Sequence, residues 1–131
     1  MEAEIRSAIK KHAEWKTHLS NAIRTGQTTL SIDEVARDDC CRFGHWLYAL
    51  DAEVRSTHRW RCVQQVHADF HRHAAAVLQL AVSGQATAAR AALSYSSGFA
   101  QTSARLTVEL TAWQKAAPAS ATATLAARGE G

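Results

Sequence analysis

The sequence predicts an all-α protein, specifically a four-helix bundle with a short helical segment between its first and second helices. Apolar residues recur at three- and four-residue steps through four segments of the chain. The 131 residues include one proline and six glycines, which disfavours the turn-rich strands of a β sandwich. Hydrophobic residues make up 47% and charged residues 21%, close to the averages of globular domains, and the length suits a single core.

The first helix is expected over about residues 2–25, where the apolar residues form a single stripe. Gly26 follows this stripe and provides a C-terminal stop. His12 lies inside the stripe, although the lysines around it belong to the charged face. Residues 31–34, with the sequence Ser-Ile-Asp-Glu, fit a capping box and predict one or two further helical turns.

The second helix is expected to begin near Asp38 or Asp39, either of which suits an N-cap, and to end at Leu50. The third is expected over residues 57–83, where large apolar side chains follow one face. Gly84 then breaks the pattern. Four amphipathic helices with short connections are typical of a helical bundle.

The fourth helix is expected over residues 86–116. Its centre, residues 94–103, is rich in serine and glycine and predicts a kink or weak packing. After Pro118 the chain is low in complexity. The bundle is therefore expected to occupy residues 1–116, and residues 117–131 are interpreted as a tail or linker.

Charge and hydropathy exclude several classes of partner. The net charge of +3 is small and the basic residues are scattered, so no nucleic-acid partner is expected. No stretch approaches the roughly 20 apolar residues of a membrane-spanning helix, and residues 1–11 lack the features of a signal peptide. We therefore expect no membrane association and a cytoplasmic location, where three cysteines stay reduced.

The histidines and cysteines indicate a metal site. His67 and His71 are four residues apart and share one helix face, beside the buried stripe. His12 adds a candidate from another helix, although a hydrogen-bonded core histidine is a common alternative for such a residue. Cys41 would lie in the first turn of a helix, where the helix dipole lowers the thiol pKa. Three nitrogens and one sulfur suit zinc in a closed shell, which favours a structural or sensory role over catalysis.

Two enzymatic alternatives fit the sequence less well, so the chain is not expected to be an enzyme. The segment from His67 to His71 has the histidines of a metalloprotease motif, but Ala68 stands where the general-base glutamate belongs. A di-iron bundle needs Glu-x-x-His pairs, and the sequence contains none.

The remaining histidines and cysteines are assigned to ordinary positions. Cys62 is expected in the core or at its boundary. Cys40 neighbours Cys41 and remains an alternative as a resolving thiol after Cys41 oxidation. The four histidines expected at the surface are His18, His45, His58 and His73.

The candidates occur in an ordered pattern. His12 is followed by Trp15, the segment 41–46 reads Cys-Arg-Phe-Gly-His-Trp, and a His-x-x-x-His pair begins at His67. Spacings of 29 and 26 residues separate the three parts. Over about residues 2–116 the chain resembles the chemoreceptor zinc-binding (CZB) domain of bacterial chemoreceptors and diguanylate cyclases.

This resemblance implies a zinc-binding sensory domain that responds to zinc level or to oxidants such as hypochlorous acid at the cysteine. It assigns Gly44 to a close helix approach and Trp46 to packing beside the metal. It also implies a homodimer and a signalling partner of the chemoreceptor or diguanylate cyclase type, expected outside this chain. A zinc-stabilised structural or oligomerising bundle without a sensing role is the alternative. The implied zinc ligands are His12, Cys41, His67 and His71.

Overall fold

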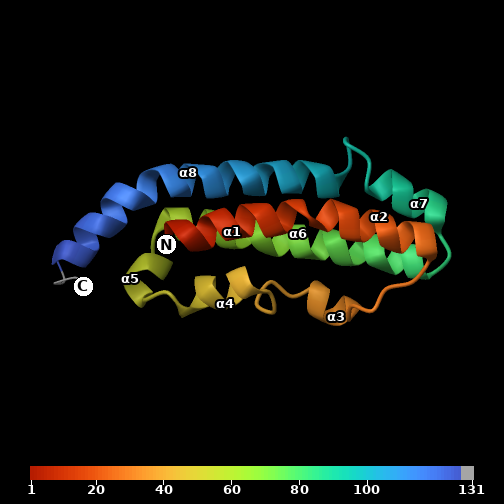
Figure 1. Cartoon of the computed structure of the whole chain (residues 1–131), viewed down its shortest axis with the longest axis horizontal. Helices are drawn as coiled ribbons and strands as arrows, with labels where there is room; N and C mark the ends of the chain where they lie inside the picture. Colours follow the sequence, from red (N-terminus) through yellow and green to blue (C-terminus); the bar gives the residue numbers. More distant parts are fainter. Residues whose placement is uncertain (128–131) are drawn as a thin grey trace.

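The computed structural model describes residues 1–127, with side chains described as far as residue 116. The described residues form helices and connecting loops and contain no strand. The all-α class is therefore confirmed. Figure 1 shows that successive parts of the chain run back and forth along one long axis.

The first pass along this axis consists of α1 (Glu2–Ala13) and α2 (Trp15–Thr25), which lie end to end (Figure 1). Glu14 separates them but keeps a right-handed helical conformation, and its carbonyl accepts from the amide of His18 at 3.2 Å. Gly26 ends α2 with a φ of 72°, a conformation that glycine adopts without steric cost. The expected first helix is thus present with one irregular turn.

The second pass is built from short helices. They are α3 (Ile32–Val35), α4 (Arg42–Ala49) and α5 (Ala52–Arg55). The hydroxyl of Ser31 accepts from the Glu34 amide at 3.3 Å, as the capping-box pattern predicts. The expected second helix is present, but its expected start at Asp38 or Asp39 is wrong. Helix α4 starts only at Arg42, because the Cys41 sulfur accepts the Gly44 amide at 3.3 Å and serves as the N-cap.

The third and fourth passes contain the long helices. The third is α6 (His58–Val82), which the Thr57 hydroxyl caps by accepting from the Trp60 amide at 3.2 Å. The fourth is divided into α7 (Ala86–Ala92) and α8 (Gly98–Ala127). A single helix over residues 86–116 is therefore wrong.

The interruption lies in the serine-rich segment where a kink was expected. The Ser97 hydroxyl accepts from the Ala100 amide at 3.1 Å and begins α8 anew. The backbone of α8 then continues through Pro118 to Ala127, so the chain does not leave the helix at residue 117. That residues 117–131 act as a tail or linker stays a prediction, and residues 128–131 lie outside the described residues.

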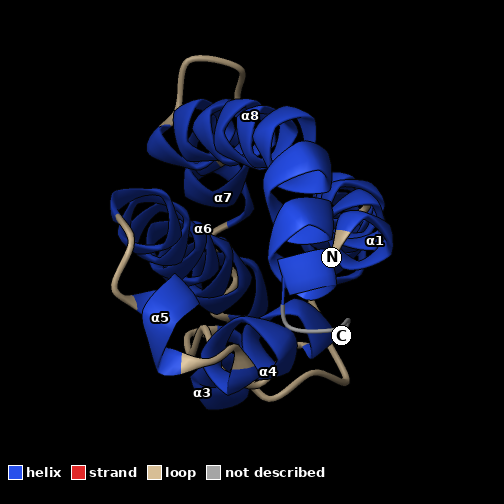
Figure 2. Ribbon diagram, turned by 90° about the vertical axis from the view of Figure 1, so that its left-hand side faces the viewer, coloured by secondary structure: helices blue, strands red, loops and turns tan. Residues whose placement is uncertain are grey.

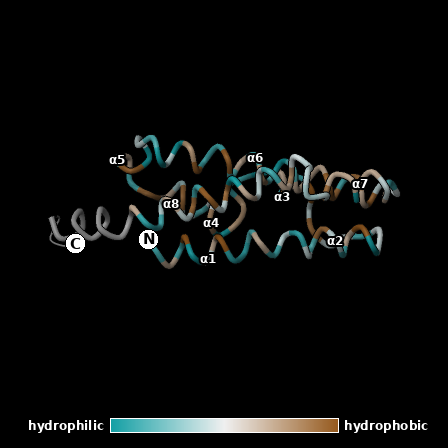
Figure 3. Tube along the Cα trace, turned by 90° about the horizontal axis from the view of Figure 1, so that it is seen from above, coloured by the Kyte–Doolittle hydropathy of each residue, from teal (hydrophilic) through white to brown (hydrophobic). Residues whose placement is uncertain are grey.

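The helices enclose one core. Viewed along the axis, α8, α6, α1 and the α3–α5 segment occupy four sides of the molecule (Figure 2). Helix α6 packs against α8, α2, α3 and α7, and α1 packs against α8 and α4. Hydrophobic residues recur at intervals along α1 and α2, in keeping with one buried stripe (Figure 3). The largest fully buried apolar side chains are Phe70, Ile5, Leu19, Leu47, Leu78, Leu106 and Leu110.

On one side, the molecule differs from a bundle of four long helices. Short helices and loops make up the α3–α5 pass, so backbone carbonyls and a helix N-cap approach α6 there. Among residues 1–127, no helix is both long and apolar enough to span a membrane.

The α8 face that packs on α6 and α1 is expected to carry much of the stability. Leu110→Ala removes a side chain with no exposure and should lower the free energy of unfolding by about 2–5 kcal/mol. Val108→Ala on the same helix is the control, because Val108 is 65% exposed and should cost less than about 0.5 kcal/mol. Urea unfolding followed by circular dichroism measures both. Equal losses for the two variants would contradict this packing.

Candidate metal centre

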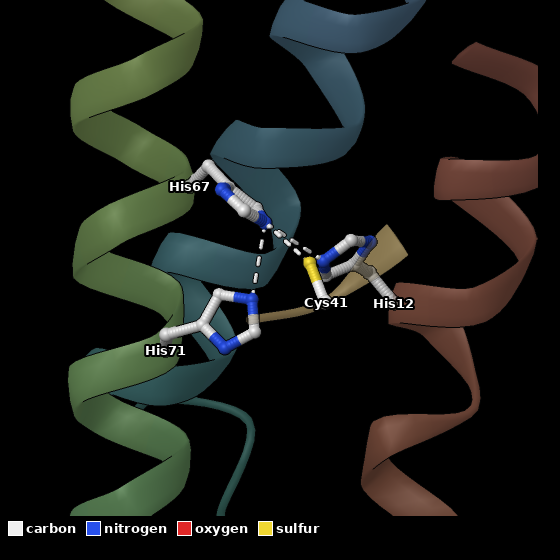
Figure 4. Close-up of side chains that lie close together, drawn as sticks. All are labelled: His12, Cys41, His67 and His71. Carbon is white, nitrogen blue, oxygen red and sulfur yellow. Dashed lines mark hydrogen bonds between the residues drawn. The ribbon is translucent and has the colours of Figure 1, made fainter. Parts of the chain in front are cut away.

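Four metal-ligand side chains from three parts of the chain meet in the core. His12 comes from the last turn of α1, Cys41 is the N-cap of α4, and His67 and His71 come from the middle of α6. Figure 4 shows the four side chains pointing toward one another. One ligand atom from each lies within 4.8 Å of the other three. The tertiary structure therefore brings together the four residues singled out in the sequence.

The His67 Nε2 atom lies at the centre of the contacts. It is 3.2 Å from Nε2 of His12, 3.0 Å from Nε2 of His71 and 3.3 Å from Sγ of Cys41. All three histidines are buried, with exposed fractions of 7%, 0% and 2% for His12, His67 and His71. Cys41 is half-buried.

Two backbone carbonyls fix the tautomers of two of these rings. The Nδ1–H group of His12 donates to the Ala8 carbonyl at 2.7 Å, and that of His71 donates to the Val35 carbonyl at 2.9 Å. Because a carbonyl only accepts, the proton of each neutral ring is on Nδ1. Each Nε2 therefore directs a lone pair toward the centre of the cluster, an arrangement typical of metal-binding histidines.

The donor set fits zinc. Lone pairs of His12 and His71 and the sulfur of Cys41 face the same point, and His67 can donate one Nε2 proton to only one of them. A cation satisfies all four donors at once. Tetrahedral zinc, with bonds of about 2.0–2.3 Å, places neighbouring donors roughly 3.3–3.8 Å apart. The three separations from His67 Nε2 are 3.0–3.3 Å, and all four donors lie within 4.8 Å of one another. Two nitrogens with fixed lone pairs, a third imidazole and a thiol are the ligand types that zinc prefers.

Burial keeps the three imidazoles neutral and ready to coordinate. Loss of solvation lowers the pKa of His12 to about 4 and that of His67 to about 2. Burial also lowers the pKa of His71, although its carbonyl contact opposes this shift. At neutral pH each ring therefore offers a nitrogen lone pair.

The expected lowering of the thiol pKa is wrong for the metal-free cluster. Burial raises the pKa of Cys41 above its usual value, and the amides of Gly44 and Phe43 offset this only in part. The metal-free cluster therefore favours the protonated thiol, and a bound cation would favour the thiolate. Zinc binding and proton release from Cys41 are then coupled.

Aromatic rings pack against the imidazoles of the cluster. The Phe43 ring lies 5.0 Å from His67 and 6.0 Å from His12, edge to face. Phe70 lies 5.1 Å from His12. Trp46 packs on Phe43 at 5.5 Å and on Trp113 at 5.7 Å, so it supports the ring that touches the imidazoles. The position beside the metal ligands, expected for Trp46, is thus taken by Phe43.

A close backbone approach holds the Cys41 loop. A Cβ atom on Gly44 would lie 2.0 Å from the Asp38 carbonyl oxygen, so only glycine fits there. The same loop is tied by Tyr48, whose hydroxyl donates to the Asp38 carboxylate at 2.5 Å, and by Gln64, which donates to the Tyr48 hydroxyl at 3.0 Å. The close approach expected of Gly44 is therefore confirmed, but its partner is a loop instead of a helix.

A cavity of about 180 Å³ between α1 and α4 reaches the cluster from one side. His12 and Cys41 line it, whereas His67 and His71 do not. The ion pair between Arg42 and Glu4, with 2.9 Å between Nη2 and Oε2, lies along its wall. Small solutes therefore approach the centre from the Cys41 side.

The other histidines and cysteines lie elsewhere. His18 packs on Trp15, and His73 contacts the start of α8 at Gly98. Cys62 lies 3.3 Å from the exposed His58 ring, and Cys40 lies 3.7 Å from Asp39. His45 is exposed.

Sequence reasoning missed the groups that orient the ligands. The Ala8 and Val35 carbonyls leave no signal in residue type, because every residue has a carbonyl. The contact between Tyr48 and Asp38 joins residues ten apart in the chain across a loop, and no periodic pattern indicates it.

The fold and the site define an all-helical protein with a buried three-histidine, one-cysteine centre suited to zinc. The family model described as the chemoreceptor zinc-binding domain (CZB) matches residues 12–78, which are 67 of the 131 residues. The chain therefore belongs to the CZB family. The matched segment begins at His12 and includes the other three residues of the cluster. No curated protein and no solved structure matches the chain.

Gly44→Ala should damage the site through the Cys41 loop. The new methyl group would collide with the backbone of Asp38, which should lower the free energy of unfolding by about 1–3 kcal/mol and weaken zinc binding. Gly26→Ala is the control: it introduces strain at a φ of 72° of about 1 kcal/mol but meets no atom within 4 Å. Competition with a zinc-binding dye measures affinity. Unchanged zinc affinity in Gly44→Ala would refute the positioning role.

The zinc-free protein should lose stability as the pH falls below 6.5. The unfolded chain takes up a proton on His12 near pH 6.5, whereas the folded chain does so only near pH 4. Between these values the unfolded state binds more protons, so the free energy of unfolding falls by at most about 1.4 kcal/mol per pH unit for each such histidine. Urea titrations of chelator-treated protein from pH 7.5 to 4.5 measure this slope. A flat profile would contradict burial of neutral histidines.

Proposed function

We propose that this chain is a zinc-binding sensory domain whose centre responds to zinc level or to oxidants at Cys41. The observation that carries the proposal is the convergence of His12, Cys41, His67 and His71 from three elements, with two imidazole lone pairs fixed by carbonyls. Membership of the CZB family supports zinc as the ion. Four protein donors complete a tetrahedral shell and leave no position for a substrate, so the proposed role is regulatory and not enzymatic.

Zinc would act as a cross-link between three separate parts of the chain. His12 ties in α1, Cys41 ties in the loop before α4, and His67 and His71 tie in α6. Because the bound form has more of these links than the metal-free form, the binding free energy of zinc adds to the stability of the fold. Loss of the ion should therefore loosen α1 and the Cys41 loop against α6, which is the structural change that a partner would detect.

The oxidant response would begin at the sulfur. A thiolate attacks hypochlorous acid at chlorine or oxygen and ends as a sulfenic acid, with chloride released and the sulfur oxidised by two electrons. A sulfenic acid is a poorer zinc ligand than a thiolate, so oxidation favours release of the ion. The cavity between α1 and α4 supports this route, because Cys41 lines it.

The proposal extends to the oligomeric state, the location and the partner of the domain. The domain acts as a homodimer in the cytoplasm and passes its state to a signalling protein of the chemoreceptor or diguanylate cyclase type. This setting is what the resemblance to the zinc-binding domains of chemoreceptors and diguanylate cyclases implies. A second candidate is a bundle in which zinc only stabilises the structure, and it is favoured by the same cross-linking of three elements.

Purified protein is expected to carry one zinc ion per chain. His67→Ala combined with His71→Ala should abolish binding, because two donors remain. Cys41→Ala should weaken binding and leave partial occupancy, because three imidazoles remain. Cys40→Ala is the matched control and should bind like the wild type, since Cys40 is exposed and lies outside the cluster. Metal analysis after dialysis measures all four proteins. Wild-type protein that holds no zinc would refute the proposed function.

The same proteins separate sensing from stabilisation. A sensor should release zinc on treatment with one equivalent of hypochlorous acid and change its dimerisation or partner binding. A purely structural bundle should keep its assembly unchanged after zinc removal or mild oxidation. Analytical ultracentrifugation with and without chelator distinguishes the two.

A further inference from the structure

The three imidazoles of the cluster are not equivalent. His12 and His71 each have an Nδ1–H group that donates to a carbonyl, at 2.7 and 2.9 Å. The Nδ1 atom of His67 is buried and has no hydrogen-bond partner among the described residues. The His67 ring itself has no exposure to solvent. One of three otherwise similar ligands therefore lacks the contact that orients the other two.

This difference matters once zinc binds through Nε2, the atom that faces the centre (Figure 4). A neutral imidazole that coordinates through Nε2 carries its proton on Nδ1. For His12 and His71 that proton is already satisfied by a carbonyl. For His67 it becomes a buried N–H group without a protein acceptor, which is an unfavourable arrangement.

Without a metal ion, the other tautomer of His67, with its proton on Nε2, is favoured. His67 can then carry its proton on Nε2 and donate it to a lone pair of His12, His71 or Cys41, all within 3.3 Å. His12 and His71 cannot do the same, because their carbonyl contacts fix the proton on Nδ1. His67 is thus the one ring of the three whose N–H group gains an acceptor when the metal leaves.

We propose that His67 is the labile ligand of this centre: its bond to zinc is the weakest of the three imidazole bonds, and its tautomer changes when the ion leaves. The proposal rests on the zinc binding proposed above. The change moves no net charge on His67, because Nδ1 loses a proton and Nε2 gains one, while the Cys41 thiolate takes up a proton from solvent. His67 therefore sets how readily the centre opens, and His12 and His71 hold its frame.

The tautomers can be read directly in the wild-type protein. Nitrogen-15 NMR spectra of the histidine rings distinguish Nδ1–H from Nε2–H in zinc-loaded and chelator-treated samples. His12 and His71 should remain Nδ1–H in both states, whereas His67 should change from Nδ1–H with zinc to Nε2–H without it. His67 in the Nδ1–H form in both states would overturn the proposal, as would a zinc-loaded His67 Nδ1–H engaged in a strong hydrogen bond.

Matched variants test the ranking of the ligands. His67→Ala and His71→Ala remove buried imidazoles one turn apart on α6. A hydrogen bond that orients a ligand, such as that from His71 to the Val35 carbonyl, is typically worth 10–100-fold in metal affinity. His71→Ala should therefore weaken zinc binding at least ten-fold more than His67→Ala. Equal losses would overturn the proposal while leaving zinc binding intact. If neither variant folds, the wild-type spectra decide. Wild-type protein without zinc affinity would instead refute the proposed function.

Discussion

The structure depends on a concentration of nitrogen and sulfur lone pairs inside an apolar core. Three neutral imidazoles and one thiol face a common point from α1, α6 and the N-cap of α4, with donors 3.0–3.3 Å from Nε2 of His67. Such an arrangement is unfavourable without a proton or a cation between the donors. A hydrophobic core alone would replace these groups with aliphatic side chains. The grouping of these four donors is therefore the arrangement expected of a metal-binding core.

The side of the molecule formed by α3, α4 and α5 contributes the groups that complete this cluster. A fourth long helix opposite α6 would present only side chains to the interior, because its own carbonyls would be used in helical hydrogen bonds. The α3–α5 pass instead brings the Val35 carbonyl to His71 and the Cys41 N-cap to His67. Gly44 and the Asp38–Tyr48 contact hold the loop before α4 against that helix. The short helices that interrupt the regular bundle are thus the ones that supply part of the site.

The four ligands come from elements that also pack in the core. Helix α1 packs against α4 and α8, and α6 packs against α8, so the elements that contribute ligands share one hydrophobic core. The approach from solvent lies on the side of Cys41 and His12, whereas His67 and His71 are sealed behind them. The proposed oxidant reaction at Cys41 would therefore begin at the cavity, and the proposed labile ligand His67 does not line that cavity.

Much of this protein was predictable from the sequence. Periodic apolar residues determine α6 and the first pass, since burial of one face is the main reason that these helices form. The spacing of His67 and His71 on one helix face, together with the Cys41–Trp46 motif, indicated the ligand set. Only the tertiary structure decided the start of α4, the break before α8 and the carbonyls that fix two imidazoles. The two helix starts depend on which of several polar side chains accepts an amide, Cys41 from Gly44 and Ser97 from Ala100. The carbonyls that orient His12 and His71 belong to the backbone, which carries no sequence signal.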